Sequence, residues 1–80
     1  MRVVIDDDQL MRRAFGAWFR AAGEFGDIPS GSDSQVEWHN GKQYVVLRNV
    51  RGVLKVYRVR LDGMLKGLHR YPPAIEDEAG

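Results

Sequence analysis

Three short turn signals divide the second half of the chain. Asn40-Gly41 is the strongest of them, because this dipeptide favours the tight turn of a two-residue hairpin, and Arg51-Gly52 and Asp62-Gly63 follow it. The segments between the turns predict strands at about residues 36–39, 43–50, 53–61 and 64–71. Strands joined by such short connections run antiparallel. The sequence therefore predicts an antiparallel meander of three to four strands.

A helix precedes the predicted meander, at about residues 6–22. Asp6 fits the N-cap position, with Gln9 as the reciprocal half of a capping box, and Gly23 fits the left-handed position after the last turn. Apolar side chains occupy one half of the helical wheel: Leu10, Met11, Ala14, Phe15, Trp18, Phe19, Ala21 and Ala22. We expect this half to pack on the sheet. A membrane surface is the weaker alternative, because the aspartates at residues 6–8 repel anionic lipid.

A single α+β domain accounts for residues 1–73, with one N-terminal amphipathic helix packed on a twisted antiparallel meander. Eighty residues are too few for two cores, and the apolar share of 44% is typical of a globular protein. Residues 23–35 are rich in Gly, Pro, Ser and Asp and predict a surface loop. Residues 74–80 predict an acidic flexible tail. Residues 2–5 are a candidate short strand.

The residues expected of an enzyme or a metal site do not occur in a recognisable pattern. The absence of cysteine excludes disulfides, thiolate metal sites and thiol nucleophiles. The serines at residues 30–34 have no Gly-x-Ser-x-Gly context, and His39 and His69 point to opposite faces of the predicted sheet. No apolar run approaches the roughly 20 residues that span a bilayer, and the first residues turn acidic too early for a secretory signal. We expect a cytoplasmic, non-catalytic protein without metal, cofactor or membrane partner.

Positive charge is concentrated in the predicted meander. Residues 42–71 carry eight basic side chains and one acidic side chain, although the net charge of the whole chain is only +1. Counting outward from two-residue turns places Val46 opposite Tyr57, and Tyr57 opposite Leu68. In this register Arg48, Lys55 and Arg70 form one transverse row, whereas two further arginines project from the other face. The candidate nucleic-acid-binding residues are Arg48, Lys55, Arg58, Arg60, Arg70 and Tyr44.

This mixture of cations and aromatic rings supports two interpretations. Lys and Arg neutralise phosphates, and aromatic faces stack on unpaired bases, which together favour binding of nucleic acid. A solvated sheet whose basic residues block edge-to-edge pairing would show the same composition. Both interpretations stay open.

Both faces of the predicted sheet are half apolar, although one helix covers only one face. Three explanations for the apolar second face stay open: the sheet curls into a half-shell, a second subunit covers this face, or this face binds a ligand. The leading functional hypothesis is a small binding module that contacts nucleic acid through its basic sheet surface. The alternative is a protein–protein interaction module or a homodimer that uses the second face.

The segment GKQYVVLRNVRGVLKVYRV at residues 41–59, together with Ala17-Trp18-Phe19-Arg20, resembles small uncharacterised proteins encoded on bacterial prophages and integrative elements. The likeness covers the predicted helix and meander. It implies no activity and no site residues. It implies a bacterial cytoplasmic accessory protein that binds a macromolecule.

Overall fold

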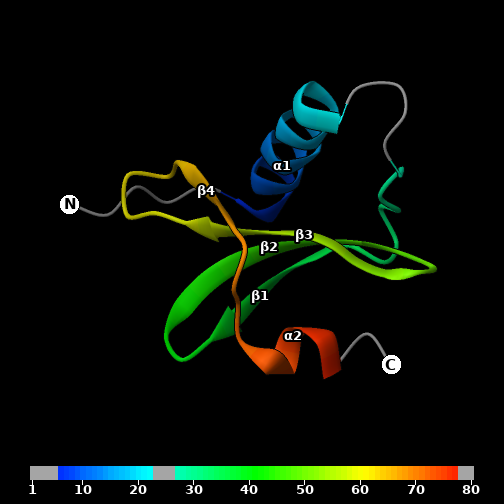
Figure 1. Ribbon diagram of the computed structural model, residues 1–80. Coiled ribbons are helices and arrows are strands. Elements are labelled where there is room, and N and C mark those ends of the chain that lie inside the picture. The colour runs from blue at the N-terminus through cyan, green and yellow to red at the C-terminus, as the bar shows by residue number, and fades with distance from the viewer. Residues whose placement is uncertain (1–5, 23–26, 78–80) are drawn as a thin grey trace.

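A helix, a four-stranded sheet and a short second helix form three layers in the computed structural model, which describes residues 6–22 and 27–77 (Figure 1). The elements are α1 (Asp7–Ala22), β1 (Gln35–His39), β2 (Lys42–Asn49), β3 (Gly52–Val59), β4 (Leu65–Leu68) and α2 (Pro73–Asp77). The strands lie in the order β1-β2-β3-β4, and every neighbouring pair is antiparallel. The predicted α+β class and the meander are therefore confirmed. The candidate strand at residues 2–5 lies outside the described residues.

Helix α1 begins as the sequence predicts. The Asp6 carboxylate accepts a hydrogen bond of 2.9 Å from the backbone N–H of Gln9, which satisfies one of the unpaired donors in the first helical turn. Leu10 and Ala14 are fully buried and face the sheet. The end of α1 at Ala22 also matches the prediction.

The first hairpin has the predicted two-residue turn. His39 pairs with Lys42, and the two residues between them both have positive φ, 53° at Asn40 and 76° at Gly41. Positive φ at both central positions gives the right-handed twist that two antiparallel strands need.

The second hairpin differs from the prediction by one residue. Asn49 pairs with Gly52, so the turn is formed by Val50 and Arg51 rather than by Arg51-Gly52. The Asn49 side chain fixes this turn, because its Oδ1 accepts a 2.8 Å hydrogen bond from the backbone N–H of Arg51. A bulge between Leu47 and Arg48 shifts the register again.

These two shifts move residues of β3 between the faces of the sheet. Val46 lies opposite Val56, and Tyr57 lies opposite Val45, so the predicted Val46–Tyr57 pair is wrong. The third hairpin has a three-residue loop instead of two, because Arg60 N donates to Met64 O just beyond the last strand pair. Tyr57 consequently lies opposite Gly67 rather than Leu68.

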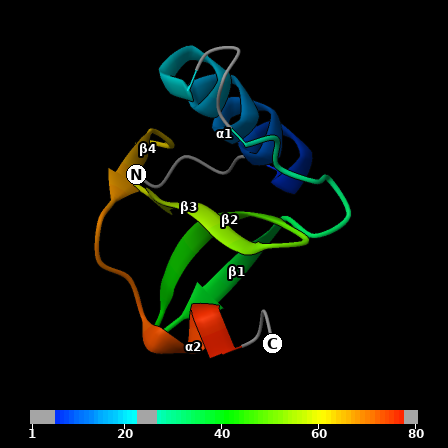
Figure 2. The ribbon, with the colours of Figure 1, turned by 45° about the vertical axis from the view of Figure 1, so that its right-hand side comes forward.

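Each face of the sheet carries its own apolar cluster. The α1 face contains Leu10, Ala14, Val45, Leu47 and Tyr57, with Phe15, Trp18, Val59 and Leu65 among the residues packed around them. The opposite face contains Tyr44, Val46, Val56 and Ile75, with Val53, Leu68 and Tyr71 packed around them. Figure 2 shows α1 and α2 on opposite sides of the sheet.

The chain itself therefore covers the second half-apolar face. The expectation of a flexible tail is wrong for residues 74–77, because they belong to α2 and Ile75 is fully buried. Residues 78–80 lie outside the described part of the chain. Burial of one isoleucine side chain contributes about 1.5–3 kcal/mol, which supplies a physical reason for the helix to stay on the sheet.

Trp18 supplies a test of the packing between α1 and the sheet. It packs with Phe15 on the cluster that contains Tyr57, and its Nε1 donates a 2.8 Å hydrogen bond to the backbone oxygen of Asp27. We expect Trp18→Ala to lower the free energy of unfolding by about 3 kcal/mol, and Trp18→Phe, which keeps most of the apolar contact, by about 1 kcal/mol. Urea denaturation measures both values. A Trp18→Ala variant as stable as the parent protein would contradict this packing.

Candidate nucleic-acid interface

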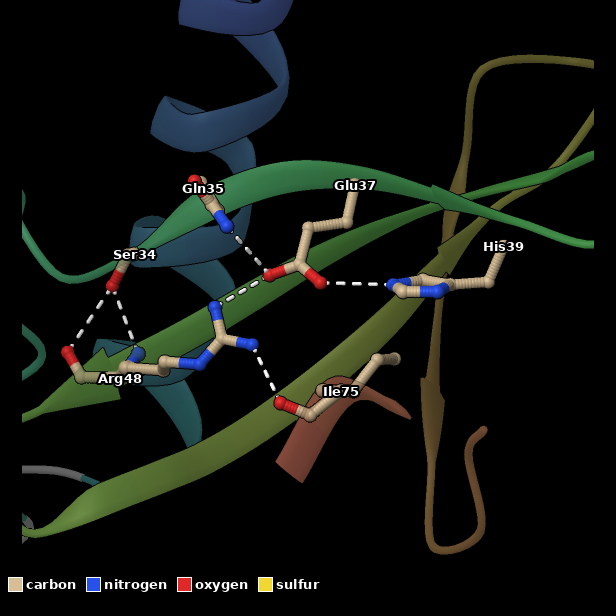
Figure 3. A network of polar contacts seen from close by, with 6 residues as sticks. All are labelled: Ser34, Gln35, Glu37, His39, Arg48 and Ile75. Atoms are coloured by element: carbon tan, nitrogen blue, oxygen red, sulfur yellow. Dashed lines mark hydrogen bonds and ion pairs between the residues drawn. The ribbon is translucent and has the colours of Figure 1, made fainter. Parts of the chain in front are cut away.

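Arg48 is buried in an ion pair and is not available to a phosphate. Its Nη1 donates to Glu37 Oε2 at 2.5 Å, and its Nη2 donates to the backbone oxygen of Ile75 at 2.7 Å (Figure 3). The two paired side chains are only 7% and 6% exposed. The prediction of Arg48 as a nucleic-acid-binding residue is therefore wrong. The guanidinium is enclosed because Glu37 of β1 lies on the same sheet face, and α2 covers both groups.

Further polar groups complete this buried network. Gln35 Nε2 donates to Glu37 Oε2 at 3.0 Å, and His39 Nε2 lies 2.8 Å from Glu37 Oε1. The Ser34 hydroxyl accepts from the backbone N–H of Arg48 at 2.9 Å and donates to the backbone oxygen of the same residue at 3.2 Å. Both carboxylate oxygens of Glu37 thus have partners, and so do both terminal guanidinium nitrogens of Arg48. Among the described residues, Nε of Arg48 is buried without a hydrogen-bond partner. The hydrogen bonds that do form lower the cost of keeping a charged pair out of water.

The network predicts an asymmetry between single and double substitutions. Glu37→Gln removes the negative charge and leaves the Arg48 guanidinium buried without a counter-charge, so we expect a loss of about 3–5 kcal/mol. The double variant Glu37→Leu/Arg48→Met removes both charges, and we expect it to recover a large part of that loss. Urea denaturation of the two variants measures the difference. Equal stability of Glu37→Gln and the parent protein would contradict the role of the pair.

Two other predicted site residues are also displaced from the expected surface. Tyr44 is 6% exposed, and its ring centroid lies 5.9 Å from that of His39, so it offers no free face to a base. Lys55 is half-buried on the α1 face, because it pairs with Leu47. Its ammonium group lies beside Gly67, 3.2 Å from where a Cβ on that glycine would be. The predicted row of Arg48, Lys55 and Arg70 does not form, because Arg48 and Lys55 lie on opposite faces. Arg70 is exposed, in the segment between β4 and α2.

Arg58 and Arg60 are exposed, but on the face that also holds α2. Tyr57 faces α1, and strand residues alternate between faces, so Arg58 points to the opposite side. Arg58 pairs with Tyr44 of β2 and with Lys66 of β4. The backbone N–H of Arg60 donates a 2.8 Å hydrogen bond to Met64 O just beyond the end of β3, and alternation from Arg58 assigns Arg60 to the α2 face.

Four exposed cations lie on the α2 face of the sheet. Lys42 joins them because it lies two residues before Tyr44 in β2, and Lys66 joins them through its pairing with Arg58. We call this group the basic face: Lys42, Arg58, Arg60 and Lys66. Arg60 Nη2 lies 3.4 Å from Asp62 Oδ2 in an exposed pair. Within residues 6–22 and 27–77, the other three cations have no ion pair.

Sequence reasoning did not select two members of the basic face, Lys42 and Lys66. A signal for Lys42 was present, because alternation outward from the correctly predicted Asn40-Gly41 turn places it on the face of Tyr44. Lys66 lies on the face of Tyr44 in the predicted register as well, because the shift in the second hairpin is cancelled by the shift in the third hairpin. There Gly63 has a φ of 85°, and its N–H donates to Arg60 O at 2.9 Å.

The described residues contain no cluster of three or more His, Asp or Glu side chains placed to hold a metal ion. Neither helix of that part of the chain is long and apolar enough to cross a membrane. Comparisons with protein-family models, with curated proteins and with solved structures each give no match.

Proposed function

We propose that the protein is a small non-catalytic module that binds nucleic acid through the basic face. The observation that supports this most is the direct pairing of Arg58 with Lys66 across β3 and β4. Like charges directly opposite each other in a sheet reduce its stability. A row of phosphates would remove this repulsion. Nucleic acid is the polyanion whose repeating charges suit cations distributed over neighbouring strands.

The proposed binding depends on charge rather than on base recognition. Tyr44, the aromatic residue within the predicted site, is buried, so it contributes no stacking surface. Exposed Lys and Arg contact phosphates in any sequence context. We therefore expect weak sequence preference and strong dependence on salt concentration.

The structure weakens the reason for the alternative, a homodimer or protein-interaction module that uses the second sheet face. That face is covered by Tyr71 and Ile75 of the same chain. The exposed large apolar side chains come from five separate segments of the chain: Phe19, Ile28, Trp38, Val50, Leu61 and Met64. A contiguous apolar patch is the usual mark of a stable protein interface.

Single charge reversals test the basic face. If the four cations each neutralise one phosphate, log K should fall with log salt at a slope of about −3 to −4 on duplex DNA. We expect Arg58→Glu to weaken binding at least tenfold at low salt. Arg51→Glu is the matched control, because Arg51 is exposed at the opposite end of the sheet, in the turn before β3, and should change affinity much less. Fluorescence anisotropy with labelled oligonucleotides measures both.

Failure of the proposal is equally measurable. Protein at micromolar concentration that binds neither DNA nor RNA in about 50 mM salt would contradict it, since even non-specific binders reach this range. Equal effects of Arg58→Glu and Arg51→Glu would show that net charge, and not the basic face, controls affinity.

Acidic residues of α2 provide a second test. Helix α2 lies on the same sheet face as the basic face, and its sequence includes Glu76 and Asp77. We expect Glu76→Gln/Asp77→Asn to tighten binding, chiefly at low salt, because less negative charge then repels the phosphates. Deletion of residues 74–80 is unsuitable, since it removes the buried Ile75. Unchanged affinity at low salt would contradict the expected repulsion.

A further inference from the structure

A second cationic surface lies on the other side of the sheet, in a groove between α1 and the start of β4. The groove has a volume of about 400 Å³ and is lined by three arginines of α1, Arg12, Arg13 and Arg20, together with Met64 and Leu65. All three arginines are exposed, and none has an ion pair within residues 6–22 and 27–77.

One of these arginines is held in position by a hydrogen bond. Arg13 Nη1 donates a 3.2 Å hydrogen bond to the backbone oxygen of Gly63, which ties α1 to the β3–β4 loop. The guanidinium group of Arg20 lies beside Gly16, 3.5 Å from where a Cβ on that glycine would be. Arg20 also acts on Tyr57: burial raises the pKa of the Tyr57 phenol, and the nearby positive charge of Arg20 acts in the opposite direction.

The chemistry of the lining indicates the kind of ligand. The polar side chains of the groove are guanidinium groups, which carry positive charge and only donate hydrogen bonds, so they favour an anionic ligand with acceptor oxygens. Leu65 is half-buried and Met64 is 58% exposed, which leaves apolar surface beside the cations. A nucleotide combines both features, because its phosphate is an anion and its base is a flat, weakly polar surface.

The groove and the basic face are separated by one edge strand. β4 is the last strand of the sheet, and Leu65 and Lys66 are consecutive residues that point to opposite faces. Leu65 lines the groove, whereas Lys66 belongs to the basic face. Seven exposed cations thus lie on the two sides of the sheet, three on the α1 side and four on the α2 side, and Lys66 lies in β4 itself.

We propose that single-stranded nucleic acid crosses the β4 edge, with phosphates on the basic face and a nucleotide in the α1–β4 groove. This inference rests on the proposed function and specifies its substrate as single strands. A duplex has a persistence length of about 150 base pairs and does not fold around one strand of a small sheet. It contacts only one of the two surfaces at a time, whereas a flexible single strand contacts both.

Two variants that each remove two charges test the inference. Arg12→Gln/Arg20→Gln alters the groove, and Arg58→Gln/Lys66→Gln alters the basic face. The probes are a labelled oligothymidine of about 20 nucleotides and a duplex of mixed sequence and equal length. Fluorescence anisotropy over a salt series gives the slope of log K against log salt, and circular dichroism verifies that each variant is folded.

The expected slopes follow from the number of phosphates neutralised. On the single strand, seven cations predict a slope of about −5, and loss of two groove charges reduces it to about −3.5. On the duplex, the slope of about −3 to −4 should be the same for the groove variant and the parent protein. The basic-face variant should reduce the slope on both probes.

The same measurements distinguish failure of the inference from failure of the proposed function. A groove variant that alters single-strand and duplex binding equally, or that alters neither, overturns the inference and leaves nucleic-acid binding intact. A parent protein that binds both probes with the same slope also overturns it. Absence of binding to both probes overturns the proposed function as well.

Discussion

The buried ion pair between Arg48 and Glu37 holds three segments of the chain together. Glu37 lies in β1, Arg48 lies in β2, and the second guanidinium nitrogen of Arg48 reaches the carbonyl oxygen of Ile75 in α2. The pair thereby fixes α2 over the face that α1 leaves uncovered, and Ile75 fills the apolar half of that face. An 80-residue chain has little core to spare, so covering both faces of its sheet adds a substantial share of its buried apolar surface.

This pair also determines which cations remain on the surface. Arg48 and the basic face lie on the same side of the sheet, but Arg48 is enclosed there by Glu37 and Ile75. Lys42, Arg58 and Lys66 remain exposed. Within residues 42–71, Arg48 therefore stabilises the fold, whereas the exposed cations of the basic face are accessible to a ligand.

Local patterns predicted those parts of the fold that depend on neighbouring residues. The Asp6 cap, the extent of α1 and the Asn40-Gly41 turn all follow from short-range hydrogen bonds or backbone preferences. Which side chains share a face in the candidate site depends on the strand register. A second turn displaced by one residue, together with one bulge, changed that register. The burial of Arg48 was beyond prediction, because its partners lie 11 and 27 residues away along the chain. Helix α2 was missed because five residues with one buried apolar side chain carry no periodic signal.

The strand order shows which basic residues could serve to block edge-to-edge pairing. Basic residues that block edge-to-edge pairing belong on edge strands, and Lys66 of β4 fits that role. Arg58 lies in β3, a central strand, and pairs with Tyr44 of β2 on one side and with Lys66 of β4 on the other. Protection of an edge gives no reason for a cation at this position, and the direct Arg58–Lys66 pairing adds repulsion within the sheet. The proposed polyanionic ligand would account for Arg58 and Lys66 by the same interaction.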